Sequence, residues 1–342
     1  MRRYVSAPGF TLLGFLLVTS LIYGQAQRPM NGGNPGGLRY LEAGQPPAMV
    51  HPTVEGMRAA RAAGFASTSN DLYYHGGTSD GAAGTVGVEA VPKVYVVFWG
   101  SQWSKDPSGE ACILVGVAGC PSGANADFLA NVGGSPWNNI VTQYCQAVPS
   151  GTFYCNGAGT AVSNGRGMLA GYWYDNASAA PTHPKQSQLA SEAVKAAAHF
   201  GNTTAQSNGS VQYVIATATG NNSSGFGRQY CAYHSSTSSS YGDVAYTNLP
   251  YITDAGASCG ANFNGLGPYA GITIVEGHEF AETETDQFPS TGWLDSGGSE
   301  IGDKCAWNSA SSNQALNGVN YPVQPLWSNA ASGGSGGCVL SY

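Results

Sequence analysis

Eight cysteines, none of them in a Cys-x-x-Cys pattern, limit most strongly what this 342-residue chain can fold into. An even number of cysteines in an exported chain predicts a disulfide framework, and the spacing argues against a zinc–thiolate site. We expect neighbours in the sequence to pair, because such pairs close short loops. The expected pairs are Cys112–Cys120, Cys145–Cys155, Cys231–Cys259 and Cys305–Cys338.

The N-terminus indicates that the chain is exported. Arg2 and Arg3 precede an apolar run over residues 10–23, and residues 24–26 (GQA) offer small side chains for cleavage. The run is shorter than the ~20 apolar residues of a membrane span, and no other stretch qualifies. We therefore predict a signal peptide over residues 1–26 and a secreted, extracellular protein that does not insert into a membrane.

Charge excludes one class of partner. Only 10% of the residues are charged, and the formal net charge is −7. Nucleic-acid binding needs basic patches, which a chain this acidic does not offer. We expect no nucleic-acid partner, and we expect a monomer.

Two regions follow the signal peptide. Residues 27–70 contain the breakers NGGNPGG and GQPP and are typical of a linker or pro-segment, in which residues 53–63 could form a short helix. We place one structured domain over residues 71–342, beginning near Tyr73.

Apolar patterning within that domain predicts a mixed α/β fold. The run VPKVYVVFWG (91–100) is typical of a strand buried on both faces. Residues 187–200 predict a helix capped by Ser187. Further expected elements are two short helices over 126–145, a buried strand over 211–220, shorter strands over 229–235 and 243–248, and a helix over about 270–286. Strand, helix and strand in this order indicate a single domain with a largely internal mixed sheet.

The last of these helices carries the motif GHEFAETETD (277–286). Residues four apart lie on one helix face, so His278 and Glu282 point the same way, and Glu279 lies on the same broad face. Zinc hydrolases hold their metal with two ligands one turn apart and use the neighbouring acid as general base. The sequence therefore predicts a zincin-like HExxE helix, in which Glu279 is the catalytic base.

The segment GWLDSGGSEIGDKC (292–305) offers the further ligand that a zinc site needs. Glu300 is the expected third ligand, and Asp303 is expected to orient a ligand or to bind as well. Asp286 and Asp295 are the competing candidates. Carboxylates in place of imidazoles make harder ions competitive, so we expect Zn²⁺, with Ca²⁺ or Mn²⁺ as alternatives.

Other histidines carry less signal. His234, in QYCAYHSS, could line the cleft as a catalytic residue that donates a hydrogen bond to the substrate or to an oxyanion, although a packed loop residue is the simpler interpretation. His51 lies in an expected loop and carries no signal. Paired acids for glycoside cleavage stay open, with the following aromatics as possible sugar platforms: Trp103, Trp137, Tyr172, Trp173, Tyr174, Trp293 and Trp307.

The motifs HEFAETETD, GWLDSGGSEIGDKC and NGVNYPVQPLWSN resemble the EXORDIUM / phosphate-induced protein family of plants and its secreted bacterial relatives. Earlier segments, YYHGG, VYVVFWGSQW and QYCAYHSS, are similar too, so the likeness covers about residues 73–342. It is specific at His278, Glu279, Ala281, Glu282, Glu300, Ile301, Gly302, Asp303 and Cys305. The resemblance implies an extracellular, single-domain, disulfide-bonded protein whose helix and EIGD segment meet at one site. The family has no settled enzymatic role.

These observations together predict a secreted metal-dependent hydrolase, most simply a zinc metallopeptidase acting on an extracellular protein or cell-wall polymer. One alternative is a non-enzymatic protein that binds cell-wall carbohydrate and holds a structural ion. The other is a carbohydrate-active hydrolase that uses two of the clustered acids.

Overall fold

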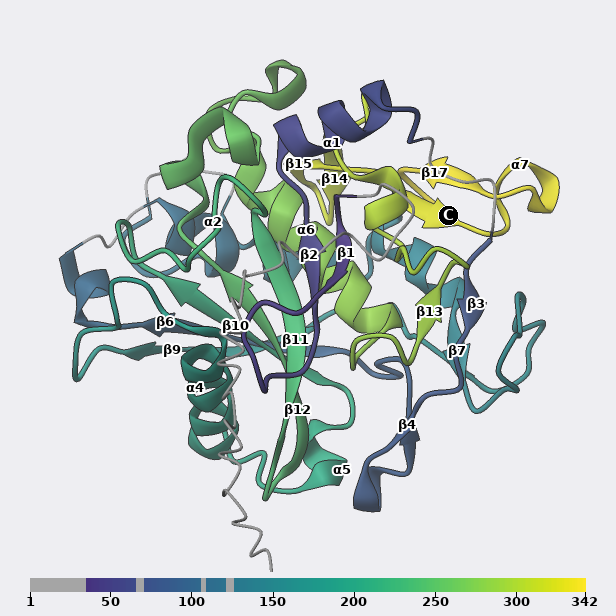
Figure 1. The fold of residues 1–342 in the computed structure, drawn as a ribbon, viewed down its shortest axis with the longest axis horizontal. Coiled ribbons are helices and arrows are strands. Elements are labelled where there is room, and N and C mark those ends of the chain that lie inside the picture. The colour runs from purple at the N-terminus through teal and green to yellow at the C-terminus, as the bar shows by residue number, and fades with distance from the viewer. Residues whose placement is uncertain (1–34, 66–70, 106–108, 121–125) are drawn as a thin grey trace, which may run out of the picture.

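The computed structural model describes residues 35–65, 71–105, 109–120 and 126–342 (Figure 1). The predicted signal peptide and the first part of the predicted pro-segment lie outside the described residues. Within them the protein is mixed α/β, as predicted, and is built around one seven-stranded sheet. Among the described helices, none has the length and apolar character needed to cross a bilayer.

The main sheet has the strand order β1-β2-β11-β12-β10-β6-β9. Its strands are β1 (Gly37–Arg39), β2 (Ala48–His51), β11 (Ala232–Ser239), β12 (Gly242–Leu249), β10 (Val211–Thr217), β6 (Lys93–Trp99) and β9 (Leu169–Asp175). The pairs β12–β10, β10–β6 and β6–β9 are parallel, whereas β1–β2, β2–β11 and β11–β12 are antiparallel. The predicted strands over 91–100, 211–220, 229–235 and 243–248 all belong to this sheet.

The remaining elements are helices, 3₁₀ turns and two-stranded pairs. The helices are α1 (Val54–Ala62), α2 (Glu110–Val115), α3 (Phe128–Val132), α4 (Gln186–His199), α5 (Ala205–Asn208), α6 (Ala270–Thr285) and α7 (Ala331–Gly334). In the described ranges, 3₁₀ turns span Gly81–Ala83, Ser101–Lys105, Asn138–Gln143, Ile252–Cys259, Phe263–Gly265 and Asp303–Cys305. The two-stranded pairs are β13 (Trp293–Leu294) with β3 (Tyr73–Tyr74), β14 (Ser312–Leu316) with β15 (Val319–Val323), β16 (Leu326–Ser328) with β17 (Gly337–Val339), β4 (Thr78–Ser79) with β5 (Thr85–Val86), and β7 (Cys145–Gln146) with β8 (Thr160–Ala161).

Alternating side chains divide the core into two apolar layers, one on each face of the sheet. On β6, Val96 and Phe98 belong to the cluster that contains α6, whereas Val97 packs in the cluster that contains α4. On β11, Ala232 lies on the α6 side and Tyr233 on the α4 side. The alternation therefore directs the next residue of β11, a histidine, toward α6.

The N-terminal segment differs from its predicted role as a linker with little structure. The expected short helix is present as α1, but residues upstream of it also form β1 and β2, at the edge of the main sheet. The predicted cap of α4 is wrong as well. The N-cap is Lys185, and Ser187 lies in the first turn, where its N–H and O–H donate to the carboxylate of Glu42, each at 2.9 Å. A residue of the N-terminal segment thus satisfies the start of this helix.

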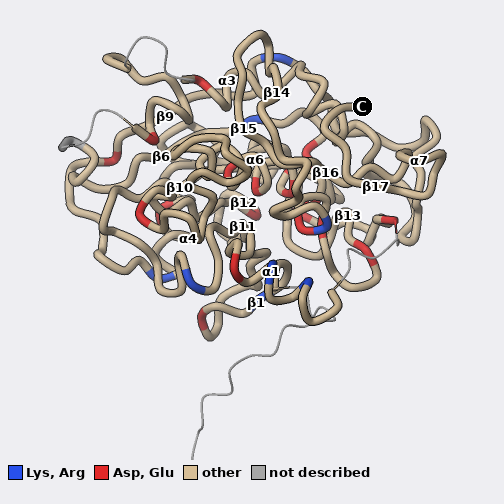
Figure 2. Tube along the Cα trace, turned by 90° about the horizontal axis from the view of Figure 1, so that it is seen from above, with Lys and Arg blue, Asp and Glu red and all other residues tan. Residues whose placement is uncertain are grey.

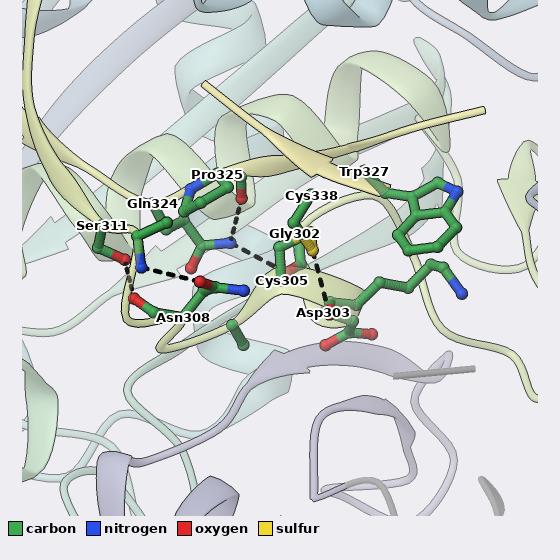
Figure 3. The surroundings of a disulfide bond; sticks show 12 residues. Gly302, Asp303, Cys305, Asn308, Ser311, Gln324, Pro325, Trp327 and Cys338 are labelled. Carbon is green, nitrogen blue, oxygen red and sulfur yellow. Dashed lines mark hydrogen bonds between the residues drawn. A yellow bond between two sulfur atoms is a disulfide. The ribbon is translucent and has the colours of Figure 1, made fainter. Parts of the chain in front are cut away.

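The predicted disulfide pairing is confirmed. The four bonds are Cys112–Cys120, Cys145–Cys155, Cys231–Cys259 and Cys305–Cys338. Figure 3 shows Cys305–Cys338 next to the loop that carries Gly302 and Asp303. There the side-chain N–H of Gln324 donates to the carbonyl oxygen of Gly302 at 2.9 Å. The disulfide and the amide together hold this loop in place.

One pH-sensitive group lies on α4, on the sheet face away from α6. Burial, and then the hydrogen bond to Asp175, raise the pKa of Glu192 to about 8. Its folded pKa is above its unfolded pKa, so the stabilisation is complete below pH ~4.5 and is lost as the pH rises through about 8. We expect the unfolding free energy, measured in urea, to decline less between pH 5 and 8 in Glu192→Gln than in the wild type. The two declines should differ by at most ~4 kcal/mol. Parallel pH profiles would contradict this.

Candidate metal centre

Helix α6 is buried along its whole length, from Ala270 to Thr285. Its first half is apolar and packs under the sheet, but its second half carries acids that are equally buried. Figure 2 shows several Asp and Glu positions gathered around α6 in the middle of the molecule. Fully buried acids are rare in proteins unless they are paired or bind metals. The acids of α6 therefore do not form a solvated charged face, which such a sequence could also have produced.

The motif residues of α6 meet the loop that follows β13. The Nε2 atom of His278 lies 2.9 Å from Oε1 of Glu282, one helical turn later. The same oxygen accepts the backbone N–H of Asp303 at 2.9 Å, and Oδ1 of Asp303 lies 4.0 Å from Nε2 of His278. The helix and the EIGD segment, 21 residues apart in the sequence at this contact, thus form one site.

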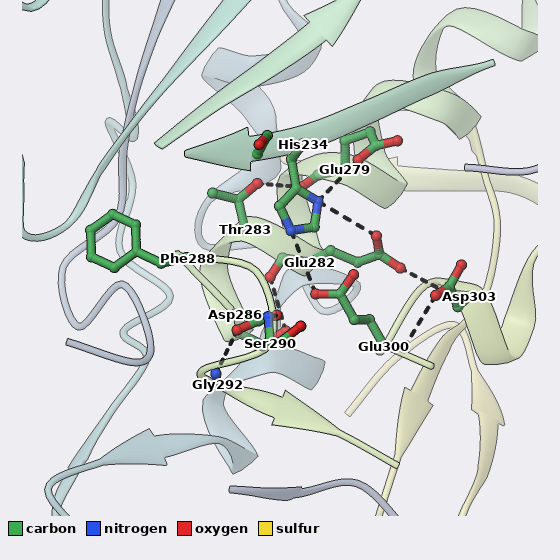
Figure 4. A network of polar contacts seen from close by, with 12 residues as sticks. His234, Glu279, Glu282, Thr283, Asp286, Phe288, Ser290, Gly292, Glu300 and Asp303 are labelled. Carbon is green, nitrogen blue, oxygen red and sulfur yellow. Dashed lines mark hydrogen bonds and ion pairs between the residues drawn. The ribbon is translucent and has the colours of Figure 1, made fainter. Parts of the chain in front are cut away.

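His234 enters this site from β11 (Figure 4). Its Nδ1 atom lies 3.1 Å from Oε2 of Glu279 and 3.7 Å from Oε2 of Glu282. Its Nε2 atom lies 3.5 Å from Oε1 of Glu300. The imidazole therefore lies between the helix acids and the loop acid, and it is more central than the sequence suggested. The alternation of side chains along β11 could have indicated this position, because it places residue 234 on the side of the sheet that faces α6.

Three overlapping groups of side chains offer ligand atoms that lie within 4.8 Å of one another. The groups are His278–Glu282–Asp303, His234–Glu279–Glu282 and His234–Asp286–Glu300. Several of these buried atoms have no hydrogen-bond partner among the described residues: His234 Nε2, Glu279 Oε1, Glu282 Oε2, Glu300 Oε1 and Oε2, and Asp303 Oδ1. Buried polar atoms are normally satisfied, so several unpartnered atoms in neighbouring side chains need an explanation.

Burial dominates the electrostatics of the site. It raises the pKa values of Glu279, Glu282, Glu300 and Asp303, and neighbouring carboxylates raise each of them further. Burial also lowers the pKa of His278 to about 3, so this imidazole is neutral. The positive charge of Arg39 lowers the pKa of Asp303 and so opposes part of this rise. Four carboxyl groups in this environment must stay protonated or be balanced by a bound cation.

Two predicted candidates have other partners. Asp286 accepts the backbone N–H groups of Ser290 and Thr291 at 2.7 and 2.8 Å, and also that of Gly292, so it holds the turn after α6. Asp295 pairs with the ammonium group of Lys304 at 2.9 Å. Glu300, the predicted third ligand beside His278, groups instead with His234 and Asp286.

His51 was missed by the sequence analysis. It is the last residue of β2, and its ring centroid lies 4.1 Å from that of His278. Its Nδ1 atom lies 2.9 Å from the carbonyl oxygen of Pro52, whereas Nε2 has no hydrogen-bond partner among the described residues. No local pattern marks this residue, because only the pairing of β2 with β11 brings it to the site.

Gly302 provides the close approach of the loop to α6. A Cβ atom at this position would lie 2.6 Å from Nδ1 of His278 and 2.9 Å from Oε1 of Glu282. We expect Gly302→Ala to lower the unfolding free energy by about 1–3 kcal/mol, because the loop must move away from the helix. Urea unfolding measures this. Gly165→Ala is the control, since a Cβ there meets nothing within 4 Å; equal losses in both variants would contradict the prediction.

No family model, curated protein or solved structure matches this chain. The likeness to the EXORDIUM / phosphate-induced protein family therefore stays a prediction based on the motifs alone.

Proposed function

We propose that the protein is a secreted metal-dependent hydrolase, most simply a peptidase of the HExxE type. The observation that carries the proposal is the convergence of unpartnered, fully buried carboxylate and imidazole atoms around Glu282. Carboxylate and imidazole atoms are the donors that a divalent cation takes, and without a cation these buried carboxyl groups would have to be protonated.

The donor set fits a divalent ion. His278, Glu282 and Asp303 supply one imidazole and two carboxylates with ligand atoms within 4.8 Å of one another. Zn²⁺ accepts both ligand types, and the surplus of oxygen ligands nearby keeps Ca²⁺ and Mn²⁺ competitive. Glu300 and Asp286 lie in the adjoining group and would complete a larger coordination sphere. A bound ion of this kind supplies Lewis acidity toward a carbonyl oxygen and toward water.

The other residues of the site have roles that follow from their contacts. Glu279 lies between the two helix ligands in the sequence, directly after His278, and would take the proton from the attacking water as general base. His234, 3.1 Å from its carboxylate, would hold Glu279 in one orientation and stabilise its charged form. Asp303 bonds to Glu282 through its backbone N–H and would fix that ligand as well.

A second function is supported by one specific observation: every donor side chain is at most 1% exposed. An ion closed off in this way could be structural, in a protein that binds cell-wall carbohydrate or a surface partner. The glycosidase alternative has less support, because the indoles of Trp103, Trp137, Trp293 and Trp307 are all in the core.

Metal analysis and digestion assays test the proposal. We expect about one equivalent of zinc or another divalent ion in the purified protein, and casein cleavage that a chelator abolishes and the added ion restores. A tightly held calcium with no cleavage of casein would favour the structural role. Chelator-resistant cleavage of a polysaccharide would favour the glycosidase. A protein that contains no metal and binds none would refute both metal-based functions.

A further inference from the structure

The candidate metal centre is closed by residues 35–65, which we call the cover segment. It contains β1, β2 and α1, and Figure 1 shows β1 and β2 beside β11 and in front of α6. The backbone of Gly36 lies so close to Asp303 that a Cβ would collide with its carboxylate. The imidazole of His51 contacts that of His278. Because β1 and β2 are antiparallel, Gly36 and His51 lie at the same end of the strand pair, and this end lies against two of the proposed ligands.

The cover segment reaches the site as an added strand. β2 pairs antiparallel with β11 in the register Ala232↔His51, Tyr233↔Val50 and His234↔Met49. Without β2, β11 would be the edge of the sheet, and its free backbone N–H and C=O groups would flank His234. An exposed edge strand is a template on which an extended polypeptide adds as a further strand. The edge of β11 therefore has the geometry of a polypeptide-binding strand next to the ligand cluster.

The attachment of the cover segment is non-covalent apart from its single chain connection. It contains no cysteine, because the first one in the chain is Cys112. Arg61 donates to the carbonyl oxygens of Ala306 and Trp307 at 2.6 and 3.0 Å, and the indole N–H of Trp307 donates to Pro52 at 2.7 Å. A single cut after α1 would leave the segment held by such contacts, by the pairing of β2 with β11 and by the packing of Val50 and Met57 in the core.

We propose that the edge of β11 binds an extended polypeptide in antiparallel alignment, and that β2 occupies this site as an internal competitor. This inference rests on the proposed function and deepens it, because it makes an extended polypeptide the substrate class. The cover segment then restricts cleavage by the intact chain, and its departure opens both the strand site and the metal centre.

The test uses the full chain with the recognition sequence of a specific protease inserted after Gly64, which is exposed. The probe is a fluorescent peptide with the sequence of residues 44–52, GQPPAMVHP. We expect saturable binding to the nicked protein, at least 10-fold weaker binding to the uncut protein, and competition by unfolded casein. The same peptide with Val50→Pro is the control, because proline disfavours a paired strand interior.

Two measurements separate this inference from the proposed function. Casein cleavage should rise at least 10-fold on nicking, with metal content unchanged. Peptide binding without metal or cleavage would refute the hydrolase and leave the strand site standing. Metal-dependent cleavage that is equal before and after nicking, or a nicked protein that unfolds or binds no peptide, would overturn the inference.

A matched pair of variants tests it without a cut. Arg61→Ala removes the two hydrogen bonds from α1 to the body of the protein, whereas Arg58→Ala alters an exposed residue of the same helix. We expect Arg61→Ala to bind the peptide several-fold more tightly than the wild type and Arg58→Ala to match the wild type. Identical affinities in all three proteins would count against the cover segment as competitor.

Discussion

Replacing Glu279 with glutamine is expected to lower the rate of casein cleavage by about 10²–10⁴-fold, the range over which general-base groups act. The substitution keeps the size of the side chain but removes the proton-accepting carboxylate beside His234. Metal content should stay at the wild-type level, because in our assignment Glu279 is the base and His278, Glu282 and Asp303 bind the ion. Steady-state kinetics and metal analysis of the same preparation provide the two measurements.

Glu284→Gln is the matched control for this experiment. Glu284 is equally buried on α6, accepts a hydrogen bond from the side chain of Asn138 at 3.2 Å, and belongs to none of the three ligand groups. Burial raises the pKa of its carboxyl group well above the usual range, so an amide changes little at neutral pH. Full activity in Glu279→Gln would refute the base assignment, and loss of metal from it would make Glu279 a ligand instead.

Glu282→Ala is expected to abolish metal binding and to destabilise the protein. Glu282 belongs to two of the three groups: Oε1 meets His278 and the N–H of Asp303, and Oε2 faces His234. Removing it leaves a buried N–H unpaired, at a cost of about 1–3 kcal/mol. If the free metal ion is present at 100 times its Kd, losing the bound ion lowers the unfolding free energy by a further ~2.7 kcal/mol.

Thermal unfolding with and without chelator checks this second prediction. The chelator should lower the Tm of the wild type but leave that of Glu282→Ala unchanged. Glu276→Gln serves as control, since Glu276 is a buried acid of α6 outside the three groups. A Glu282→Ala protein that retains stoichiometric metal would show that the ion lies elsewhere.

Local sequence was sufficient for much of the fold. The apolar runs at 91–100 and 211–220 form β6 and β10. A strand that is buried on both faces is a continuous apolar run, so it can be recognised without knowing its neighbours. The neighbour pairing of the cysteines held because short loops bring the partners together in any compact structure. Helix α6 formed where its composition predicted, and the four-residue spacing brought His278 and Glu282 into contact.

Long-range pairing was beyond the reach of the same reasoning. His234 contacts Glu279 across 45 residues, and that contact depends on the register of β11 over α6. Glu300 joined His234 rather than His278 for the same reason. The breakers in residues 27–70 suggested a linker, but strands as short as β1 and β2 leave little periodic signal, and their stability comes from the edge they pair with.

The sequence by itself determined that this chain has a mixed α/β body, four local disulfides and a helix whose histidine and acids share one face. These properties arise from spacing along a single element or a short loop. Only the tertiary structure decided that the acids are fully buried, that His234 and His51 join them, and that the N-terminal strands close the site. Burial and strand register depend on neighbours distant in the chain, so no local pattern encodes them.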